Sequence, residues 1–326
     1  MENLKLSIIL PIYNTNKHLT TCLDNLQAQT LNSFEVIIID DHSSDDLMPI
    51  LHQYLQDPKF HYYRLPEQKG PGGARNAGLD IAQGEYIGFC DSDDWVDLNY
   101  YERGIAFMEL HQADIGMCTL VREADGYEKE KLYKCKYDQF MKLTPDITIK
   151  IMTYQFDSGI KVIPPCTNKI YRKNFLQSLN IHFEEHIYFQ DVYFSFQTIL
   201  RANMIICIPH VCYHHYRRLH SIIQSFDQKH IDDFCRLFTL IRDFLKTEGL
   251  YERYCLNYYK LCEHFYNIVI RQIFEFVQYE EERKRYMMSS FKALKQVVIL
   301  EEYFEYATAE ELRMHIQPHI TDTTLY

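Results

Sequence analysis

The sequence predicts an α/β fold in which helices flank a mostly parallel sheet, followed by a C-terminal helical appendage. Four short apolar runs alternate with segments of helical periodicity between residues 6 and 90. Each apolar run ends in polar or glycine-rich residues, whereas residues 226–326 repeat apolar side chains at helical spacing. Alternating strands and helices are typical of a parallel sheet covered by helices on both faces.

The four predicted strands cover residues 6–14, 34–41, 61–65 and 85–90. The first is almost wholly apolar, as expected of a strand buried on both faces. Helices are predicted at residues 19–26, from apolar side chains at helical spacing, and at about 46–56, behind good N-cap residues. A glycine-rich loop over residues 70–78 leads into the third helix.

Two regions are predicted, an α/β domain over residues 1–222 and a helical region over residues 223–326. In the second region, apolar residues between 231 and 245 follow a helical period, and further amphipathic runs come after them. We expect three or four helices, whose aromatic stripes form a core or a self-association face more readily than a lipid anchor. A homo-oligomer through this region is therefore left open.

Composition and charge restrict both the function and the compartment. The 326 residues carry a formal net charge of −11, which argues against a nucleic-acid-binding protein because such proteins show a basic face. The ten cysteines form no CxxC pair and indicate buried thiols in a reducing compartment. The sequence shows neither a signal-peptide pattern nor an apolar run of the roughly 18–20 residues that span a bilayer. We therefore expect a cytoplasmic protein, with peripheral association at the inner face of the membrane left open.

Three carboxylates, those of Asp91, Asp93 and Asp94, directly follow the fourth predicted strand. Acidic groups gathered at the end of a strand repel one another and are tolerated when a divalent cation or a hydroxyl-rich ligand takes up the charge. A solvated, aspartate-rich turn is the alternative. The context favours a binding site, because parallel α/β folds bind ligands at the carboxyl ends of their strands. The polar residues expected at that edge are Asn14, Asp40, Asp41, Arg75, Asp91 and Asp93.

Other nucleotide-binding motifs fit poorly. The glycine-rich segment lacks the GxGxxG order of a dinucleotide site and follows the third strand instead of the first. It also lacks the GK[ST] ending of a P-loop. A nucleotidyltransferase would carry a loop rich in glycine, arginine and lysine after the first strand, and residues 12–17 do not form one.

Four segments, in order, resemble the signatures of family 2 glycosyltransferases. They read ILPIYN at residues 9–14, IDDHSSD at 39–45, GARNAG at 73–78 and FCDSDD at 89–94. The resemblance covers residues 5–115 closely and extends loosely to residue 221. It implies an inverting, metal-dependent enzyme with the GT-A fold, a Rossmann-like, mostly parallel sheet. The sequence departs from the family at His42, which replaces the commoner glycine and adopts a left-handed backbone less readily.

The resemblance implies a site for a nucleotide-sugar donor, usually a uridine nucleotide, on the polar edge of the sheet. Pro11, Tyr13 and either Asp40 or Asp41 would hold the base and the ribose. Arg75 would lie near the base or the phosphates. The donor is thus the first expected partner of this chain.

The same resemblance implies Mn²⁺ or Mg²⁺ at the acidic cluster. Asp91 would face the ribose or the metal, and Asp93 would bind a metal that bridges the two phosphates. Hard cations prefer carboxylate oxygen, and a metal stabilises the charge that develops on a leaving nucleoside diphosphate. Asp94 is either a further ligand or, more readily, the N-cap of the following helix.

An inverting transfer needs a base that deprotonates the acceptor hydroxyl. In this family the base belongs to a Glu-Asp pair at the start of a helix; Asp191 matches it, and Gln190 replaces the usual glutamate. As an alternative, Asp191 is the ordinary N-cap of a helix over residues 192–200. Upstream, Lys169 and Arg172 would contact a phosphate-bearing acceptor or lie on a solvated surface.

Residues 211–221 resemble the strand and loop that close over the pyrophosphate. Arg217 or Arg218 would pair with phosphate oxygens, and Ser221 would donate a hydrogen bond. One of three histidines would complete the metal shell, with a structural role as the alternative. These histidines are His214, His215 and His220.

The resemblance therefore implies an inverting glycosyltransferase (EC 2.4) of hexosyl or N-acetylhexosaminyl type. It would move a sugar from a nucleotide-diphosphate donor, with a UDP-sugar favoured, to a saccharide or lipid-linked acceptor in cell-surface polysaccharide synthesis. The alternative is an inactive nucleotide-sugar-binding partner of another transferase. Gln190 keeps that alternative open, whereas Asp91, Asp93 and Asp191 argue against it.

Overall fold

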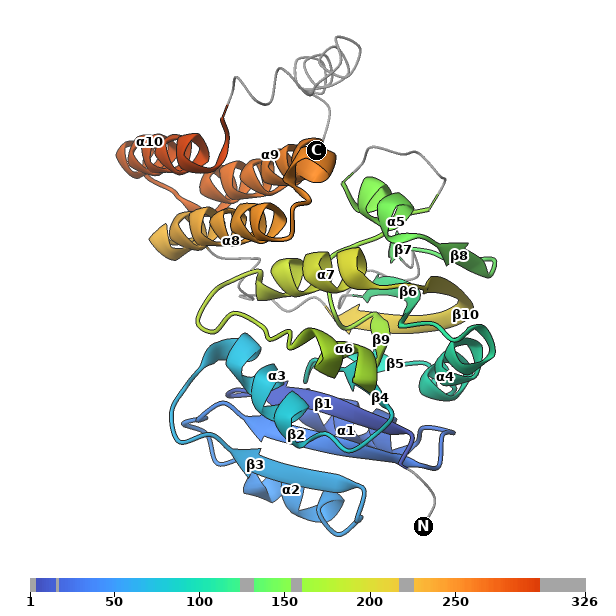
Figure 1. Ribbon diagram of the computed structural model, residues 1–326. Coiled ribbons are helices and arrows are strands. Elements are labelled where there is room, and N and C mark those ends of the chain that lie inside the picture. The colour runs from blue at the N-terminus through green and yellow to red at the C-terminus, as the bar shows by residue number, and fades with distance from the viewer. Residues whose placement is uncertain (1–3, 16–17, 124–131, 154–159, 217–225, 300–326) are drawn as a thin grey trace. The chain divides into compact units, whose positions relative to one another are not determined.

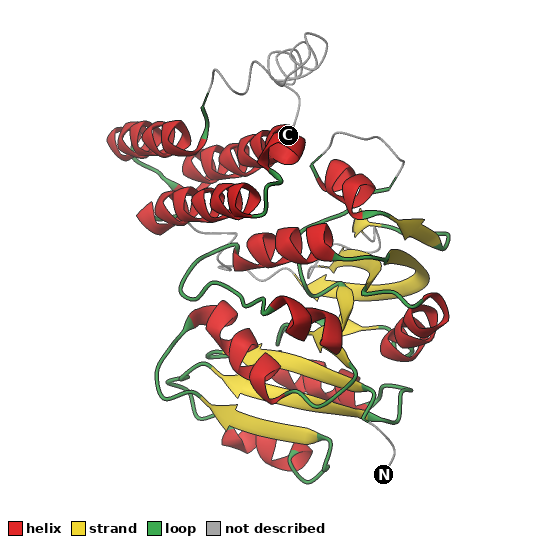
Figure 2. Cartoon of the chain, in the orientation of Figure 1, coloured by secondary structure: helices red, strands yellow, loops and turns green. Residues whose placement is uncertain are grey.

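The computed structural model describes residues 4–15, 18–123, 132–153, 160–216 and 226–299. The chain divides into two compact units, residues 1–221 and 222–326. The first unit contains a sheet with helices packed on it, and the elements described in the second are all helices (Figure 1 and Figure 2). Within these ranges, no helix is both long and apolar enough to cross a membrane.

The sheet of the first unit has the strand order β3-β2-β1-β4-β9-β6-β10-β5, with β7 paired to β6 and β8 to β10. The strands are β1 (Leu6–Ile12), β2 (Phe34–Asp40), β3 (Phe60–Arg64), β4 (Tyr86–Phe89), β5 (Trp95–Val96), β6 (Ile115–Glu123), β7 (Leu132–Cys135), β8 (Met141–Leu143), β9 (Lys169–Arg172) and β10 (Ile205–Tyr216). β3, β2, β1 and β4 run parallel, as do β6 and β10, whereas β9 is antiparallel to both β4 and β6. The chain order reverses between β1 and β4, so their carboxyl ends border the crevice where open α/β sheets bind ligands.

Helices cover both faces of this sheet (Figure 1). They are α1 (Leu19–Gln27), α2 (Met48–Tyr54), α3 (Gly70–Ile81), α4 (Tyr100–His111), α5 (Pro145–Met152), α6 (Lys173–Leu179) and α7 (Gln190–Arg201). Gly78 of α3 lies against Ile9 of β1, and Gly104 of α4 lies against Ile170 of β9. The register of β1, β4 and β9 places Ile9 and Ile170 on opposite faces, so α3 and α4 pack on opposite sides.

The four predicted strands are confirmed as β1 to β4, and the first two predicted helices as α1 and α2. β1 and β2 are buried along almost their whole length, which explains their continuous apolar runs. The predicted glycine-rich loop is wrong, because residues 70–78 lie within α3. A Cβ atom at Gly72 would overlap the carbonyl oxygen of Glu184. Glycine is needed there because the helix packs closely against the backbone of Glu184.

Three helices are described in the second unit, α8 (Gln228–Thr247), α9 (Tyr251–Phe276) and α10 (Glu280–Val297), and each packs on the other two. The ring of Phe238 in α8 contacts the rings of Tyr258 and Phe265 in α9. The Tyr258 hydroxyl donates to the carbonyl oxygen of Val297 at 2.7 Å. The aromatic stripes therefore form a core between the helices. Residues 300–326, where a fourth helix was left open, lie outside the described residues.

Candidate active site

Asn14 joins the loops at the carboxyl ends of β1 and β2. Its backbone is left-handed, with φ of 47°. Its side-chain oxygen accepts from the Ser44 amide at 2.9 Å, and its own amide donates to the Ser43 hydroxyl at 3.1 Å. Tyr13 next to it is 45% exposed, and Pro11 is half-buried within β1. The Tyr13 ring is thus available to a ligand, whereas the Asn14 side chain holds two loops together.

Asp40, at the end of β2, is 1% exposed and uses both carboxylate oxygens within the protein. Oδ1 accepts from the Ser43 amide at 2.8 Å, and Oδ2 accepts from the Tyr62 hydroxyl at 2.7 Å. His42 in this turn has φ of 63°, so it adopts the left-handed backbone that glycine usually supplies. Asp40 therefore holds the turn and ties β2 to β3, and its contact with a nucleoside stays a prediction.

Asp41 caps the amino end of α3. Oδ1 accepts from the Lys69 amide at 2.7 Å, and Oδ2 accepts from the Gly70 amide at 2.9 Å. Burial raises the pKa of the Asp41 carboxyl, and these two N–H donors partly oppose the rise. A carboxylate is favoured at a helix N-terminus, where backbone N–H groups lack partners. Asp41 thus positions α3, and its contact with the ribose also stays a prediction.

Asp94 is buried and bound to β10. Its Oδ2 accepts from the Tyr213 hydroxyl at 2.6 Å, and its Oδ1 accepts from the Tyr216 amide at 2.8 Å. The Tyr213 hydroxyl also accepts from the Asp91 amide at 3.0 Å, so one phenol fixes both ends of the acidic loop. The prediction that Asp94 caps the next helix is wrong, because α4 begins only at Tyr100. Both Asp94 oxygens thus hold β10, and its alternative role as a metal ligand stays a prediction.

Arg75 of α3 is 4% exposed and lies at the centre of the site. Its Nη2 donates to Asp91 Oδ1 at 2.6 Å, and its guanidinium lies 5.6 Å from the ring centroid of Phe183. The charges of Asp91 and Asp191 both act on it. Its Nε and Nη1 are buried and find no acceptor among the described residues. Such unpaired groups cost about 1–3 kcal/mol each, and oxygen atoms of a ligand would remove that cost.

Asp191 lies in the first turn of α7. The N-cap of this helix is Phe189, with φ of 58°, so the alternative that Asp191 is itself the cap is wrong. Burial raises the pKa of the Asp191 carboxyl, and the cationic Arg75 partly opposes the rise. A raised pKa makes a carboxylate a better proton acceptor. Gln190 is 6% exposed, and its side-chain oxygen has no hydrogen-bond partner in the described part of the chain.

Asn76 holds the segment that leads to Asp191, and sequence reasoning missed this role. Its Oδ1 accepts from the Phe183 amide at 2.7 Å, and its Nδ2 donates to the Phe183 carbonyl at 2.9 Å. Nearby, the His186 amide donates to the Lys69 carbonyl at 3.2 Å. Residues 183–186 therefore pack on the glycine-rich face of α3. The available signal was the position of Asn76 inside the GARNAG motif.

The acidic loop fits a hard cation that a phosphate-bearing ligand helps to coordinate. The Asp91 side chain is 36% exposed, and Asp93 is also partly exposed. Burial raises the pKa of Asp94, and the nearby charges of Asp93 and Asp91 add to the rise. Across the described ranges, no three His, Cys, Asp or Glu side chains are grouped to hold a metal by themselves. Mg²⁺ is commonly bound by one or two carboxylates with phosphate and water, which matches this pair.

His214 is not a metal ligand, contrary to one of the predicted choices. Its Nδ1 lies 2.7 Å from Glu123 Oε1, its Nε2 lies 3.0 Å from Asp97 Oδ1, and its ring stacks on Trp95. Burial alone lowers the pKa of His214, but the two carboxylates outweigh it and leave that pKa raised. Both ring nitrogens are therefore used in the protein. The predicted ligands Arg217, Arg218, His220 and Ser221 lie outside the described residues.

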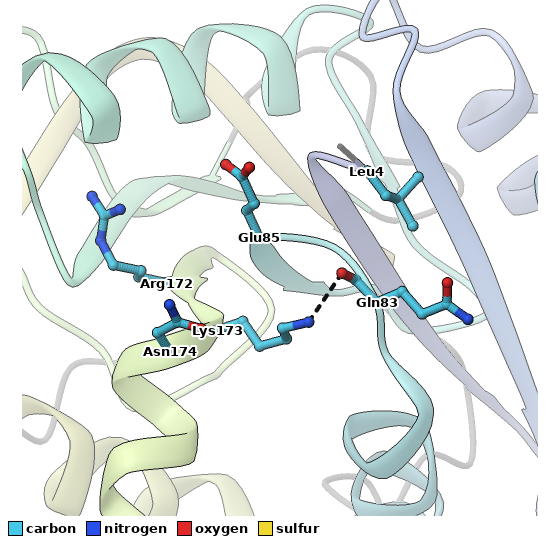
Figure 3. Close-up of a pocket in the computed structure, with 6 residues that line it drawn as sticks. All are labelled: Leu4, Gln83, Glu85, Arg172, Lys173 and Asn174. Atoms are coloured by element: carbon cyan, nitrogen blue, oxygen red, sulfur yellow. Dashed lines mark hydrogen bonds between the residues drawn. The ribbon is translucent and has the colours of Figure 1, made fainter. Parts of the chain in front are cut away.

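Both predicted locations are wrong for Lys169, whereas for Arg172 only the acceptor contact is wrong and the surface alternative holds. Lys169 is 1% exposed, so it neither faces solvent nor reaches an acceptor. Arg172 lies at the amino ends of β1 and β4, the edge opposite the site, beside a polar cavity of about 280 Å³ (Figure 3). The cavity is lined by Leu4, Gln83, Glu85, Arg172, Lys173 and Asn174.

Comparison with known proteins agrees with the order of motifs. The family model of glycosyl transferase family 2 matches residues 7–179, more than half of the chain. EpsH of Bacillus subtilis (strain 168) is 28% identical over 263 residues, 78% of this chain and 73% of EpsH. The poly(ribitol-phosphate) beta-N-acetylglucosaminyltransferase TarS of Staphylococcus aureus (strain MW2) is 28% identical over 216 residues, 65% of this chain. That match spans 35% of TarS, about a third of its length.

Solved structures share the fold. The crystal structure of S. aureus TarS 1–349 in complex with UDP-GlcNAc gives a TM-score of 0.61 at 20% identity, covering 92% of this chain and 91% of that chain. A mannosyltransferase of Pyrobaculum calidifontis, solved with GDP-Man and Mn²⁺, gives a TM-score of 0.55 at 12% identity, covering 95% and 78%. These matches confirm the predicted α/β fold of the GT-A type. With its motifs, its fold and its family match in agreement, the chain belongs to glycosyl transferase family 2.

Proposed function

We propose that this chain is an inverting glycosyltransferase that uses a UDP-sugar with Mn²⁺ or Mg²⁺. The observation that carries the proposal is the convergence of Arg75, Asp91 and Asp191 from α3, the end of β4 and α7. Arg75 donates to Asp91 and interacts electrostatically with Asp191, and two of its buried N–H groups have no partner among the described residues. A nucleotide-sugar would bring oxygen atoms to that position.

On the donor side, Asp91 and Asp93 would hold the metal, which when bound stabilises the charge on the leaving diphosphate. Tyr13 would contact the base, and Arg217, Arg218 and Ser221 would bind the phosphates. TarS has been solved with UDP and with UDP-GlcNAc, which supports UDP-GlcNAc as the first donor to test. The Asp91–Arg75 ion pair keeps Asp91 oriented before the donor arrives.

On the acceptor side, Asp191 would take the proton from the attacking hydroxyl. Its place in the first turn of α7 is set by the segment that Asn76 holds. The similarity to TarS, a poly(ribitol-phosphate) beta-N-acetylglucosaminyltransferase, supports a saccharide or polymer acceptor in bacterial cell-surface polysaccharide synthesis. The retained carboxylate at Asp191 favours an active enzyme over an inactive sugar-binding partner.

Calorimetric titration with UDP, with and without Mn²⁺, tests the donor site in three proteins. We expect tight binding by wild type only with Mn²⁺, loss of that binding in Asp93→Ala, and retained binding in Asp138→Ala. Asp138 is a suitable control because it is an exposed carboxylate paired with Lys136 away from the acidic loop. Absence of UDP binding in every condition would contradict the donor assignment.

Release of UDP from UDP-GlcNAc tests the base. Asp191→Asn should keep metal-dependent UDP binding and lose turnover, because asparagine cannot accept the proton. Wild-type turnover in this variant would refute the base assignment. Binding without turnover in wild type, over a panel of UDP-sugars and acceptors, would instead indicate an inactive binding partner.

A further inference from the structure

Residues 163–168, which we call the carbonyl segment, precede β9 and contain the consecutive residues Pro164 and Pro165. Proline has no N–H, so this stretch is rich in acceptors and poor in donors. Donors from outside the segment or from its end satisfy every carbonyl. They are Lys169 Nζ to Ile163 (2.7 Å) and Pro165 (2.5 Å), Ser195 Oγ to Pro164, the Lys169 amide to Cys166 (3.2 Å), Tyr100 Oη to Thr167 (3.4 Å) and the Cys118 amide to Asn168 (2.9 Å).

Lys169 supplies half of this support, because its side chain and its amide bind three of the six carbonyls. Its third N–H donates to Asn168 Oδ1 at 3.1 Å, and Asn168 in turn donates from Nδ2 to the Cys118 carbonyl at 2.8 Å. All three partners of the ammonium are neutral oxygens, and the side chain is 1% exposed. Burying a cation whose hydrogen-bond partners are all neutral is costly. The cost is offset if the ammonium fixes the conformation of the carbonyl segment.

The carbonyl segment borders the candidate site on the side of Asp191. Ser195 binds the Pro164 carbonyl from α7, and it lies four residues after Asp191, on the same face of that helix. The Cys166 side chain interacts electrostatically with Arg75 and Asp191. Lys169 thus fixes the carbonyl segment, and Ser195 connects that segment to α7, the helix that carries the proposed base.

We infer that Lys169 is a positioning residue: through the carbonyl segment and Ser195 it sets where an acceptor hydroxyl meets Asp191. The inference rests on the proposed role of Asp191 as the base. Lys169 does not touch substrate itself. Its loss should therefore lower turnover while UDP binding, which depends on the acidic loop, stays unchanged.

The test compares four proteins with UDP and Mn²⁺ as the binding probe and UDP-GlcNAc as the turnover probe. In Lys169→Met we expect kcat for UDP release to fall about tenfold or more, because small misplacements of reacting groups cost this much, with the Kd for UDP within about twofold of wild type. Lys169→Arg keeps the charge and several donors and should recover part of the loss. Lys173→Met is the matched control: Lys173 also donates to a backbone carbonyl, that of Gln83 at 3.0 Å, but at the opposite edge of the sheet (Figure 3).

The pH profile gives a readout that a merely structural role would not change. Burial lowers the pKa of Lys169 to about 8, and the groups that face it are the thiols of Cys118, Cys135 and Cys166 and the carboxylate of Asp191. Burial raises the pKa of all three thiols, so they stay neutral near that pH. Wild-type kcat should fall as the pH rises through about 8, where Lys169 loses one of its three donors. Lys169→Arg should lack this decline, because a guanidinium stays charged.

Ser195→Ala serves as a milder variant in case Lys169→Met does not fold, and it should lower kcat with unchanged UDP binding. Equal kcat in wild type and the folded variants would overturn this inference and leave the proposed function intact. A loss of UDP affinity that matches the loss of kcat would do the same. A wild type that neither binds UDP nor turns over UDP-GlcNAc would instead overturn the proposed function, and this inference with it.

Discussion

Two asparagines make the same bidentate contact with backbone on two sides of the candidate site, so they offer a matched pair of perturbations. Asn76 binds the N–H and C=O of Phe183 at 2.7 and 2.9 Å. Asn25 of α1 binds the N–H and C=O of Val96, both at 2.9 Å. We predict that Asn76→Ala and Asn25→Ala lower the free energy of unfolding by similar amounts. Asn76→Ala should impair turnover, whereas Asn25→Ala should impair UDP binding.

The expected loss of stability follows from burial. Phe183 is 3% exposed and Val96 is 1% exposed. The backbone N–H and C=O groups that lose their partner in either variant therefore remain buried. Losing two hydrogen bonds at a buried position costs about 2–4 kcal/mol. A loss of about 3 kcal/mol corresponds to a fall in Tm of roughly 6–12 °C for a unit of this size.

Thermal unfolding, UDP titration and UDP release separate the two variants. Asn76→Ala should lower turnover and leave metal-dependent UDP binding intact, because the segment at Phe183 leads to Asp191. Asn25→Ala should weaken metal-dependent UDP binding, because Val96 belongs to β5, the strand that directly follows the acidic loop. A Tm of Asn76→Ala within about 1 °C of wild type, or identical functional losses in the two variants, would refute this reasoning.

Three further predictions concern stability. Gly72→Ala should cost about 1–2 kcal/mol in urea unfolding, because overlap with the Glu184 carbonyl (roughly 1–3 kcal/mol) exceeds the helix-propensity gain of about 0.5–1 kcal/mol; a stabilised variant would contradict the close packing. Tyr213→Phe should cost about 2–3 kcal/mol in the same assay and weaken Mn²⁺-dependent UDP binding, since it removes the donor to buried Asp94; an unchanged midpoint would contradict this. Burial lowers the pKa of His264, so the unfolded chain binds its proton more readily and wild-type stability falls as the pH drops through the usual histidine range. His264→Gln should therefore lose less stability than wild type between about pH 7 and pH 5 in denaturation experiments at each pH, and an equal loss would argue against this role.

Local sequence was sufficient for the parallel core and for the edge that carries the site. The apolar runs of β1 to β4 are recognisable because burial on both faces depends on residues that are neighbours in the chain. The order of the motifs placed Arg75 and Asp91 at the carboxyl ends of those strands, where the structure brings them within 2.6 Å. Polar residues at the end of a buried strand therefore predict a site even when the tertiary contacts of those residues are unknown.

Only the tertiary structure decided what each polar group does. Asp94 was expected to cap a helix nearby, yet its partner Tyr213 lies 119 residues further along the chain. Lys169 looked like a surface or acceptor-binding cation, and the fold buries it against the carbonyl segment. Gly72 was expected in a glycine-rich loop, and it lies instead on a helix face that Glu184 closely approaches. Hydrophobic periodicity reports which side of an element is buried, whereas the partner of a buried polar group depends on contacts between distant segments that form only when the sheet is assembled.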